Sequence, residues 1–174
     1  MDERHDDPQH PAAEQRPADR PAAAHPADRY QRPGWGTQHL FNPGVRWLTR
    51  HGMSLKGSRE LAVRGRKSGQ WRTTAVNLLV LGDERFLVAP RGQTEWVRNL
   101  RVAGEGTLRV GRHVEAFGAT ELPDDAKVVV LREYLRRWRS EVGVFFQGVG
   151  PDASDAELAA IAPGYPVFKL QAAA

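Results

Sequence analysis

Two tight turn signals constrain the fold of this chain more than any other feature. Gly82-Asp83 and Gly111-Arg112 each stand between two short runs of alternating or aliphatic residues. The runs that they separate are residues 71–81 and 85–90 for the first turn, and residues 107–110 and 114–120 for the second. Two-residue turns of this kind connect antiparallel strands. The pattern therefore predicts an antiparallel sheet or a small barrel.

The other expected elements complete an α+β domain with helices at its periphery. Two further strands, at residues 59–64 and 165–170, bring the number of strands to six. Helices are expected at residues 43–51, 94–104 and 123–139, and a short one after Ser154. Thr94 is the expected N-cap of the second helix, and Ser154 with Glu157 forms a capping box for the last one.

The N-terminal segment differs in composition from the rest of the chain. Residues 1–36 contain seven acidic and five basic side chains, six of the 12 prolines, and no Val, Ile, Leu or Phe. Such a segment cannot bury enough apolar surface to offset its chain entropy, so a disordered tail is expected there. Its net charge of −2 leaves +6 on residues 37–174, the predicted folded domain, because the whole chain carries +4. A basic surface suits an anionic partner.

Several function classes find no support in the residues. The chain has no cysteine, and no stretch approaches 18 consecutive apolar residues, so thiol chemistry and a transmembrane helix are excluded. None of the five serines lies in a G-x-S-x-G motif, and the six histidines are scattered, so neither a serine hydrolase nor a metal site is expected. The first residues lack an apolar signal region, which favours a cytoplasmic protein. An enzyme with so few acid, base and nucleophile candidates would depend on a cofactor.

One basic segment lies between the first two expected strands. It places four cations within nine residues, with no acid among them: Arg64, Arg66, Lys67 and Arg72. Gly65 and Gly69 free the backbone there, so N–H groups and side chains could converge on a phosphate or a carboxylate. The alternative is a solvated hairpin loop.

A second window follows the strand at 85–90 and leads into a helix. Arg91 adds charge near the start of that helix, where backbone N–H groups are free to bind an anion, and Gly92 permits close approach of a ligand. Trp96 is either a core residue or the border of a flat heterocycle. Together the two windows suggest one elongated groove with a cationic end and an apolar, Trp-lined end.

The motifs in these windows resemble those of the deazaflavin-dependent nitroreductase/oxidoreductase family. They are G-R-K-S-G-Q-x-R-T-T at 65–74, A-P-R-G-x-T-E-W-V-R-N-L-R at 89–101, V-G-R at 110–112 and P-V-F-K-L at 166–170. The resemblance covers roughly residues 40–170. It implies a split β-barrel like that of pyridoxine-phosphate-oxidase-type proteins. It also implies coenzyme F420, a deazaflavin with a phospholactyl-oligoglutamate tail, rather than FMN.

The resemblance further implies a set of cofactor-binding residues and a reaction. The basic loop would bind the phosphate and tail through Arg66, Lys67, Ser68, Gln70, Arg72 and Thr73, and the second motif would line the ring through Ala89, Arg91, Gly92, Trp96, Val97 and Asn99. The expected reaction is hydride transfer from the reduced ring to a quinone, a nitroaromatic compound or an activated alkene.

The chain departs from the family pattern on the acceptor side. Family members often carry a serine just before the basic residue of the second motif, where this chain has Pro90, which lacks any hydrogen-bond donor. Asn77 and the pair Phe145 and Phe146 stand where members often have tyrosines. These three are the acceptor-side candidates, and Phe145-Phe146 is either a mobile apolar lid or ordinary core.

The sequence also bears on other possible ligands and partners. Pro90 favours a non-catalytic split-barrel protein that carries a lipid or another hydrophobic ligand. Only the basic balance favours nucleic acid, and the aromatic platform used for single strands is missing, so none is expected. Peripheral membrane contact through residues 40–48 stays open, as does the choice between a monomer and a homodimer.

Overall fold

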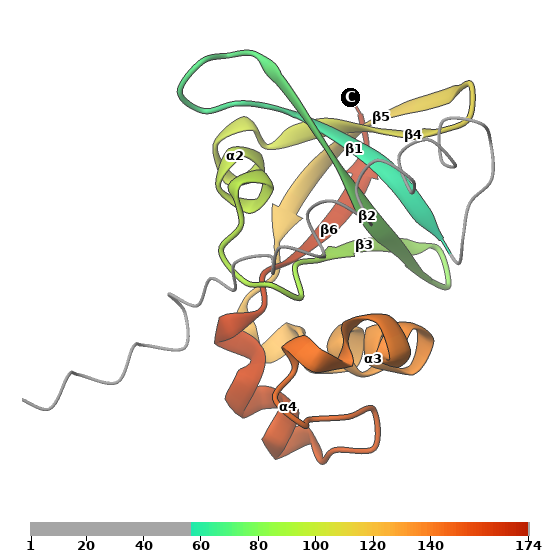
Figure 1. Cartoon of the computed structure of the whole chain (residues 1–174), viewed down its shortest axis with the longest axis vertical. Helices are drawn as coiled ribbons and strands as arrows, with labels where there is room; N and C mark the ends of the chain where they lie inside the picture. Colours follow the sequence, from blue (N-terminus) through green and yellow to red (C-terminus); the bar gives the residue numbers. More distant parts are fainter. Residues whose placement is uncertain (1–56, 174) are drawn as a thin grey trace, which may run out of the picture.

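The computed structural model describes residues 57–173, which form an antiparallel barrel with helices outside it (Figure 1). The strands are β1 (Ser58–Arg64), β2 (Trp71–Leu81), β3 (Glu84–Val88), β4 (Glu105–Val110), β5 (His113–Glu121) and β6 (Val167–Ala172). They close in the order β1-β2-β3-β6-β5-β4, and all neighbours are antiparallel. The predicted fold class, an α+β protein with a split β-barrel, is confirmed.

Three α-helices accompany the barrel in the described part of the chain. They are α2 (Glu95–Ala103), α3 (Val128–Val142) and α4 (Asp155–Ile161). Three 3₁₀ turns, at Asp124–Ala126, Gly143–Phe145 and Ala162–Gly164, join them to their neighbours. In Figure 1, α2 lies beside the barrel next to the β1–β2 connection, while α3 and α4 cover the opposite end. The barrel therefore has one helix near the basic loop and a separate helical layer below.

Both turn signals produce the expected hairpins. The β2–β3 hairpin pairs Leu81 with Glu84 across the first turn, and the β4–β5 hairpin pairs Val110 with His113 across the second. Gly82 and Gly111 have φ values of +57°, in the left-handed region that favours glycine. The turn residues thus set the register of both hairpins.

The predicted helix at 123–139 was wrong at both ends. Residues 124–126 form a 3₁₀ turn, and α3 begins only at Val128 and continues to Val142. The side chain of Lys127 is buried at this junction, where its ammonium donates to the Asp124 carboxylate at 2.6 Å and to the Ala162 carbonyl at 3.4 Å. These contacts fix the turn ahead of α3.

The last strand begins at Val167, two residues later than expected. The 3₁₀ turn before it ends at Gly164, and the buried Tyr165 donates its hydroxyl hydrogen bond to the Phe145 carbonyl at 2.6 Å. That contact directs Tyr165 toward the helical layer and away from the sheet.

The core is divided by the barrel wall. The interior cluster includes Leu61, Leu87 and Phe117, whereas Phe86 and Val88 point outward and pack against α3 and α4. Adjacent residues of β3 therefore belong to different clusters, as expected for a strand buried on both faces.

The expected tail at 1–36 and the expected helix at 43–51 lie outside the described residues. Within residues 57–173, no helix has the length and apolar character needed to cross a membrane.

Candidate functional site

The connection between β1 and β2 is a compact loop. The Gly65 N–H donates to the Gln70 carbonyl at 2.9 Å, and the Gly69 N–H donates to the Gly65 carbonyl at 2.8 Å. Gly69 has a φ of +65°, and Lys67 and Ser68 are exposed at the tip. The backbone bonds hold the loop in one shape while its polar side chains remain accessible to a ligand.

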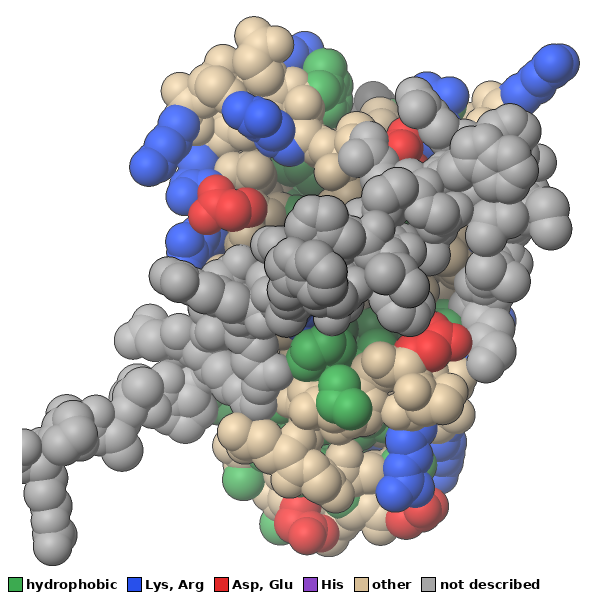
Figure 2. Space-filling view, viewed as in Figure 1, with side chains coloured by type: hydrophobic (Ala, Val, Ile, Leu, Met, Phe, Trp, Pro, Cys, Tyr) green, Lys and Arg blue, Asp and Glu red, His purple; other side chains and the backbone are tan. Residues whose placement is uncertain are grey.

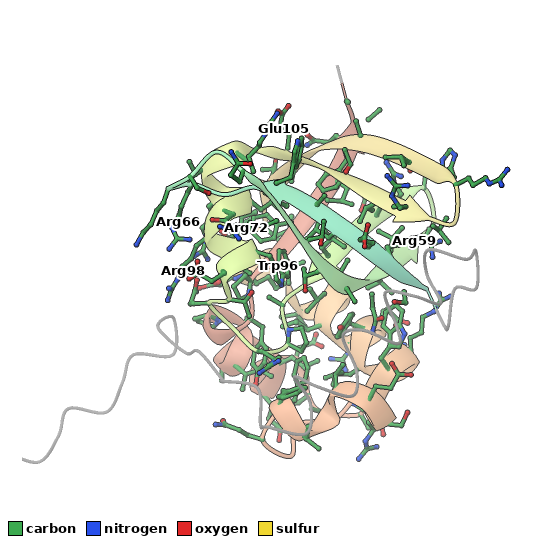
Figure 3. All side chains as sticks on the ribbon, turned by 45° about the horizontal axis from the view of Figure 1, so that its top comes forward. Arg59, Arg66, Arg72, Trp96, Arg98 and Glu105 are labelled. Carbon is green, nitrogen blue, oxygen red and sulfur yellow. The ribbon has the colours of Figure 1, made fainter. Side chains whose placement is uncertain are left out.

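This loop is fastened to α2 by Arg66. Its backbone N–H and its guanidinium both donate to Asn99 Oδ1, at 3.2 and 3.0 Å, and the guanidinium also donates to Glu95 Oε2 at 2.7 Å. Asn99 is buried and its side chain faces the loop. Figure 3 shows Arg66 and Arg98 on the same side of α2. The two windows of the sequence thus meet in space, over a separation of about 30 residues along the chain.

Glu95 lies between two arginines at the start of α2. Arg98 donates to Glu95 Oε1 at 3.2 Å, while Arg66 binds the other oxygen. The hydrogen bond from Arg66 holds the pKa of the Glu95 carboxyl below its usual range, and the charges of both arginines add to this effect. The carboxylate is therefore charged at neutral pH, and it also has a favourable position at the positive end of the helix dipole.

The N-terminus of α2 has polar groups left over for a ligand. Thr94 occupies the N-cap position as expected, but its side chain makes no capping hydrogen bond. Its Oγ1 atom is buried and has no hydrogen-bond partner within residues 57–173. The first N–H groups of a helix have no acceptor inside the helix. An orphaned hydroxyl, free amides and adjacent arginines together fit a phosphate or carboxylate group.

Further cations lie on the β1–β2 connection and on the strand ends beside it. Lys67 and Arg72 are exposed and make no ion pair with any described residue, whereas the guanidinium of Arg64 lies 4.4 Å from the Trp71 ring centroid. Figure 2 shows Lys and Arg side chains gathered over the β1–β2 connection and α2, with acidic side chains few among them. Thr73, the last residue predicted in this loop, is exposed on β2. The surface is thus strongly positive despite the carboxylate of Glu95.

The second motif combines buried and accessible residues. Ala89 and Val97 are fully buried, so their side chains belong to the barrel core and only their backbone groups are available to a ligand. Trp96 is half-buried, with its ring centroid 5.8 Å from that of Phe168. Gly92 is buried at a φ of +74°. Trp96 is therefore the large apolar side chain of this motif that remains partly accessible.

The acceptor-side candidates lie around the junction of the barrel with α3. The guanidinium of Arg91 lies 5.6 Å from the ring centroid of the half-buried Phe145. Phe146 is fully buried and stacks on Tyr165 with ring centroids 4.3 Å apart, so it is core. Asn77 is half-buried on β2, and its side-chain hydrogen bond with the hydroxyl of Tyr134 lowers the pKa of that hydroxyl. Arg91 and Phe145 thus come together, whereas Phe146 faces away from them into the helical layer.

Three polar residues at these places were not among the predicted site residues: Thr94, Glu95 and Tyr134. The spacing of Glu95 and Arg98 marks an i,i+3 ion pair on a helix. Nothing in the sequence indicates that Arg66, on the β1–β2 connection, also binds Glu95.

Burial raises the pKa of Tyr134, which keeps its hydroxyl protonated beside Asn77. The described residues contain no group of three His, Asp or Glu side chains able to hold a metal ion.

Comparison with solved structures places the fold among known ones. A protein of unknown function from Agrobacterium tumefaciens has a TM-score of 0.51 and 17% identity, over 78% of this chain and 56% of that one. This chain therefore spans little more than half of that protein's length. A domain-swapped dimer also scores 0.51, with 14% identity over 74% of this chain and 93% of the other. An F420-H2 dependent reductase scores 0.48, with 16% identity over 66% and 94%.

Sequence comparison identifies the family. No curated protein matches the chain. Residues 46–148 match the family described as F420H(2)-dependent quinone reductase, which is more than half of the chain and includes both basic windows. The expected resemblance to deazaflavin-dependent reductases is thereby confirmed, and this chain belongs to the F420H(2)-dependent quinone reductase family.

Proposed function

We propose that this protein is a reductase that binds coenzyme F420, with the anionic tail along the β1–β2 connection and the N-terminus of α2. The observation that carries the proposal is the junction of Arg66 with Glu95 and Asn99, which joins the two windows into one cationic surface. Family membership supports the choice of cofactor. FMN has a single phosphate and would leave most of this surface unused.

The tail would be held mainly by charge. Lys67 is exposed in the loop and Arg72 on β2, where the backbone is already fixed by hydrogen bonds, so only their side chains lose freedom on binding. Ser68, Gln70 and Thr73 add neutral hydrogen-bond donors on the same loop and strand. Thr94 Oγ1 and the first amides of α2 would receive the phosphate.

The ring would lie toward the second motif. Trp96 offers an accessible apolar surface, and the left-handed Gly92 lets the ligand approach the backbone. Bound in its reduced form, the cofactor would supply a hydride, and a quinone that takes up this hydride with one proton from water becomes a quinol. Arg91 and Phe145 would position the acceptor, with the guanidinium stabilising negative charge that develops on it.

A binding titration tests the proposal. The purified full-length chain is titrated with coenzyme F420 and, in parallel, with FMN, and fluorescence reports binding. Submicromolar binding of the deazaflavin alone is the expected result, followed by turnover with quinone, nitroaromatic and activated-alkene acceptors. Equal or tighter binding of FMN would contradict the choice of cofactor, and absence of binding to either would contradict the function.

A second candidate is a carrier of a lipid or another hydrophobic ligand. Pro90 favours it, because this residue has neither a side-chain donor nor an N–H to offer an acceptor. Val144 in the adjacent turn is 81% exposed, which leaves an apolar side chain in water beside Phe145. Such a carrier would co-purify with an apolar ligand, detectable by mass spectrometry of an organic extract, and would reduce no acceptor with reduced coenzyme F420.

A further inference from the structure

The carboxylate of Glu95 stands where the cationic surface is meant to receive an anion. It is the acid that the arginines of both windows share: Arg66 comes from the β1–β2 connection, and Arg98 from α2 itself. Its side chain is 67% exposed, and it is the first residue of the helix. A phosphate bound at this helix terminus would seek the same two guanidinium groups. Glu95 and the ligand therefore compete for one set of donors.

The loop does not need Glu95 to stay in place. Asn99 is buried and accepts hydrogen bonds from both the backbone N–H and the guanidinium of Arg66. These two bonds persist if the Glu95 carboxylate moves away. An exposed ion pair contributes little net stability, because its charges are well solvated when apart. Displacement of the Glu95 carboxylate into water thus costs little free energy. An acid that held the loop in place would be expected to be buried.

We propose that Glu95 is an internal competitor of the cofactor's anionic tail, and that its carboxylate holds Arg66 and Arg98 until a phosphate or glutamate carboxylate of the ligand replaces it. This inference rests on the proposed function. Lys67 and Arg72, which have no ion-pair partner within residues 57–173, would attract the tail first. A ligand with many charges then outcompetes Glu95, while a ligand with few does not. Glu95 is in this sense a specificity residue for highly charged tails.

Removal of the Glu95 charge tests this directly. Glu95→Gln is expected to tighten binding of coenzyme F420 by about 3- to 10-fold at low salt, because the competitor no longer repels the tail. The gain should shrink as salt increases. Affinity for the same deazaflavin ring without phosphate and glutamates should not change. A gain of equal size for the tailless ring would overturn the inference, as would unchanged or weaker binding of the full cofactor.

Glu105→Gln is the matched control. Glu105 is exposed just beyond the C-terminus of α2 and makes no ion pair with a described residue, so this variant makes the same change in charge. It lies beyond the far end of α2, a helix about 14 Å long. The screening length at physiological salt is about 8 Å, so the two variants are compared at that salt. A gain in affinity as large as that of Glu95→Gln would show a general charge effect and overturn the inference.

A second probe separates this inference from the proposed function. Inorganic pyrophosphate carries the anionic chemistry without any ring, and calorimetry measures its binding to the same variants. Tighter pyrophosphate binding by Glu95→Gln, together with no binding of coenzyme F420 by any variant, would refute the proposed cofactor but support competition between Glu95 and an anion. Binding of coenzyme F420 by the unmodified chain with no gain from Glu95→Gln would support the cofactor and refute the competition.

Discussion

Tyr134 is a residue whose acidity is altered by its surroundings. It is buried in the helical layer, with its ring centroid 4.9 Å from that of Trp138, and burial raises the pKa of its hydroxyl despite the opposing contact with Asn77. The phenol is therefore neutral in the folded protein at pH values where it ionises in the unfolded chain. A raised acid pKa gives stability that is complete below the unfolded pKa, near 10, and is lost as the pH rises above it.

We predict that Tyr134→Phe changes the alkaline stability of the protein. Above pH 10 the unmodified protein should lose about 1.4 kcal/mol of unfolding free energy per pH unit from this group, and the variant should not. Urea titrations at pH 8, 10 and 11 measure the difference between the two proteins. The other tyrosines and the lysines are common to both and cancel. A constant difference across this range would show that the hydroxyl is not shielded from ionisation.

Gly106 on β4 stands at a position where the packed neighbours leave no room for a side chain. A Cβ atom there would lie 2.9 Å from the Ala62 carbonyl oxygen and 2.9 Å from Phe117 Cζ, both inside the packed barrel. Gly106→Ala should therefore destabilise the protein by about 1–3 kcal/mol. Gly118→Ala on the paired strand is the control, because its nearest neighbour would be a flexible glutamine side chain at 3.7 Å. Similar losses in chemical denaturation for both variants would contradict this steric reason.

Among the elements, the β1–β2 connection and the start of β2 carry exposed cations that make no ion pair with a described residue. Lys67 and Arg72 contribute no ion pair within the described residues, so Lys67→Ala and Arg72→Ala should leave the melting temperature nearly unchanged. Each should weaken coenzyme F420 binding by about tenfold, and the tailless ring much less, since an exposed cation contributes through charge. Fluorescence titrations with both ligands measure this. Equal losses for the two ligands would contradict the assignment of the tail to this loop.

The helix α4 depends on a local signal. Ser154 and Glu157 exchange side-chain and backbone hydrogen bonds in the capping box, and Arg132 of α3 binds the Asp155 carboxylate. Ser154→Ala should reduce the unfolding free energy by about 1 kcal/mol. Ser140→Ala, at an exposed position in α3, is the control and should have little effect. An equally small change for both would show that packing of Leu158, rather than the cap, holds this helix.

Elements with local signals were the ones that the sequence predicted well. The bounds of β2 agree with the predicted residues 71–81, and the capping box at Ser154 is present. The contact between Arg66 and Asn99, and the pairing of β6 with β3, depend on partners distant in the sequence. No turn or periodicity encodes such contacts. The basic windows were therefore predictable as segments, whereas the bridge between them at Glu95 was not.

The whole molecule depends on its last strand. β6 pairs with β3 on one side and with β5 on the other, and it buries Val167, Phe168 and Leu170. The match to the family ends at residue 148, before α4 and β6. The matched residues thus include the basic loop and α2, but they end before the strand that closes the barrel around them.

We predict that a chain ending at Gly164 does not fold cooperatively, although it retains both binding windows. Without β6, the edges of β3 and β5 lose their hydrogen-bond partners and the interior cluster opens to water. A chain ending at Ala172 keeps every strand pair and is the control. Thermal unfolding followed by circular dichroism should show a sharp transition for the control only. A sharp transition in the shorter chain would mean that the two windows and their strands are stable without closure, since nothing else among the described residues replaces β6 between β3 and β5.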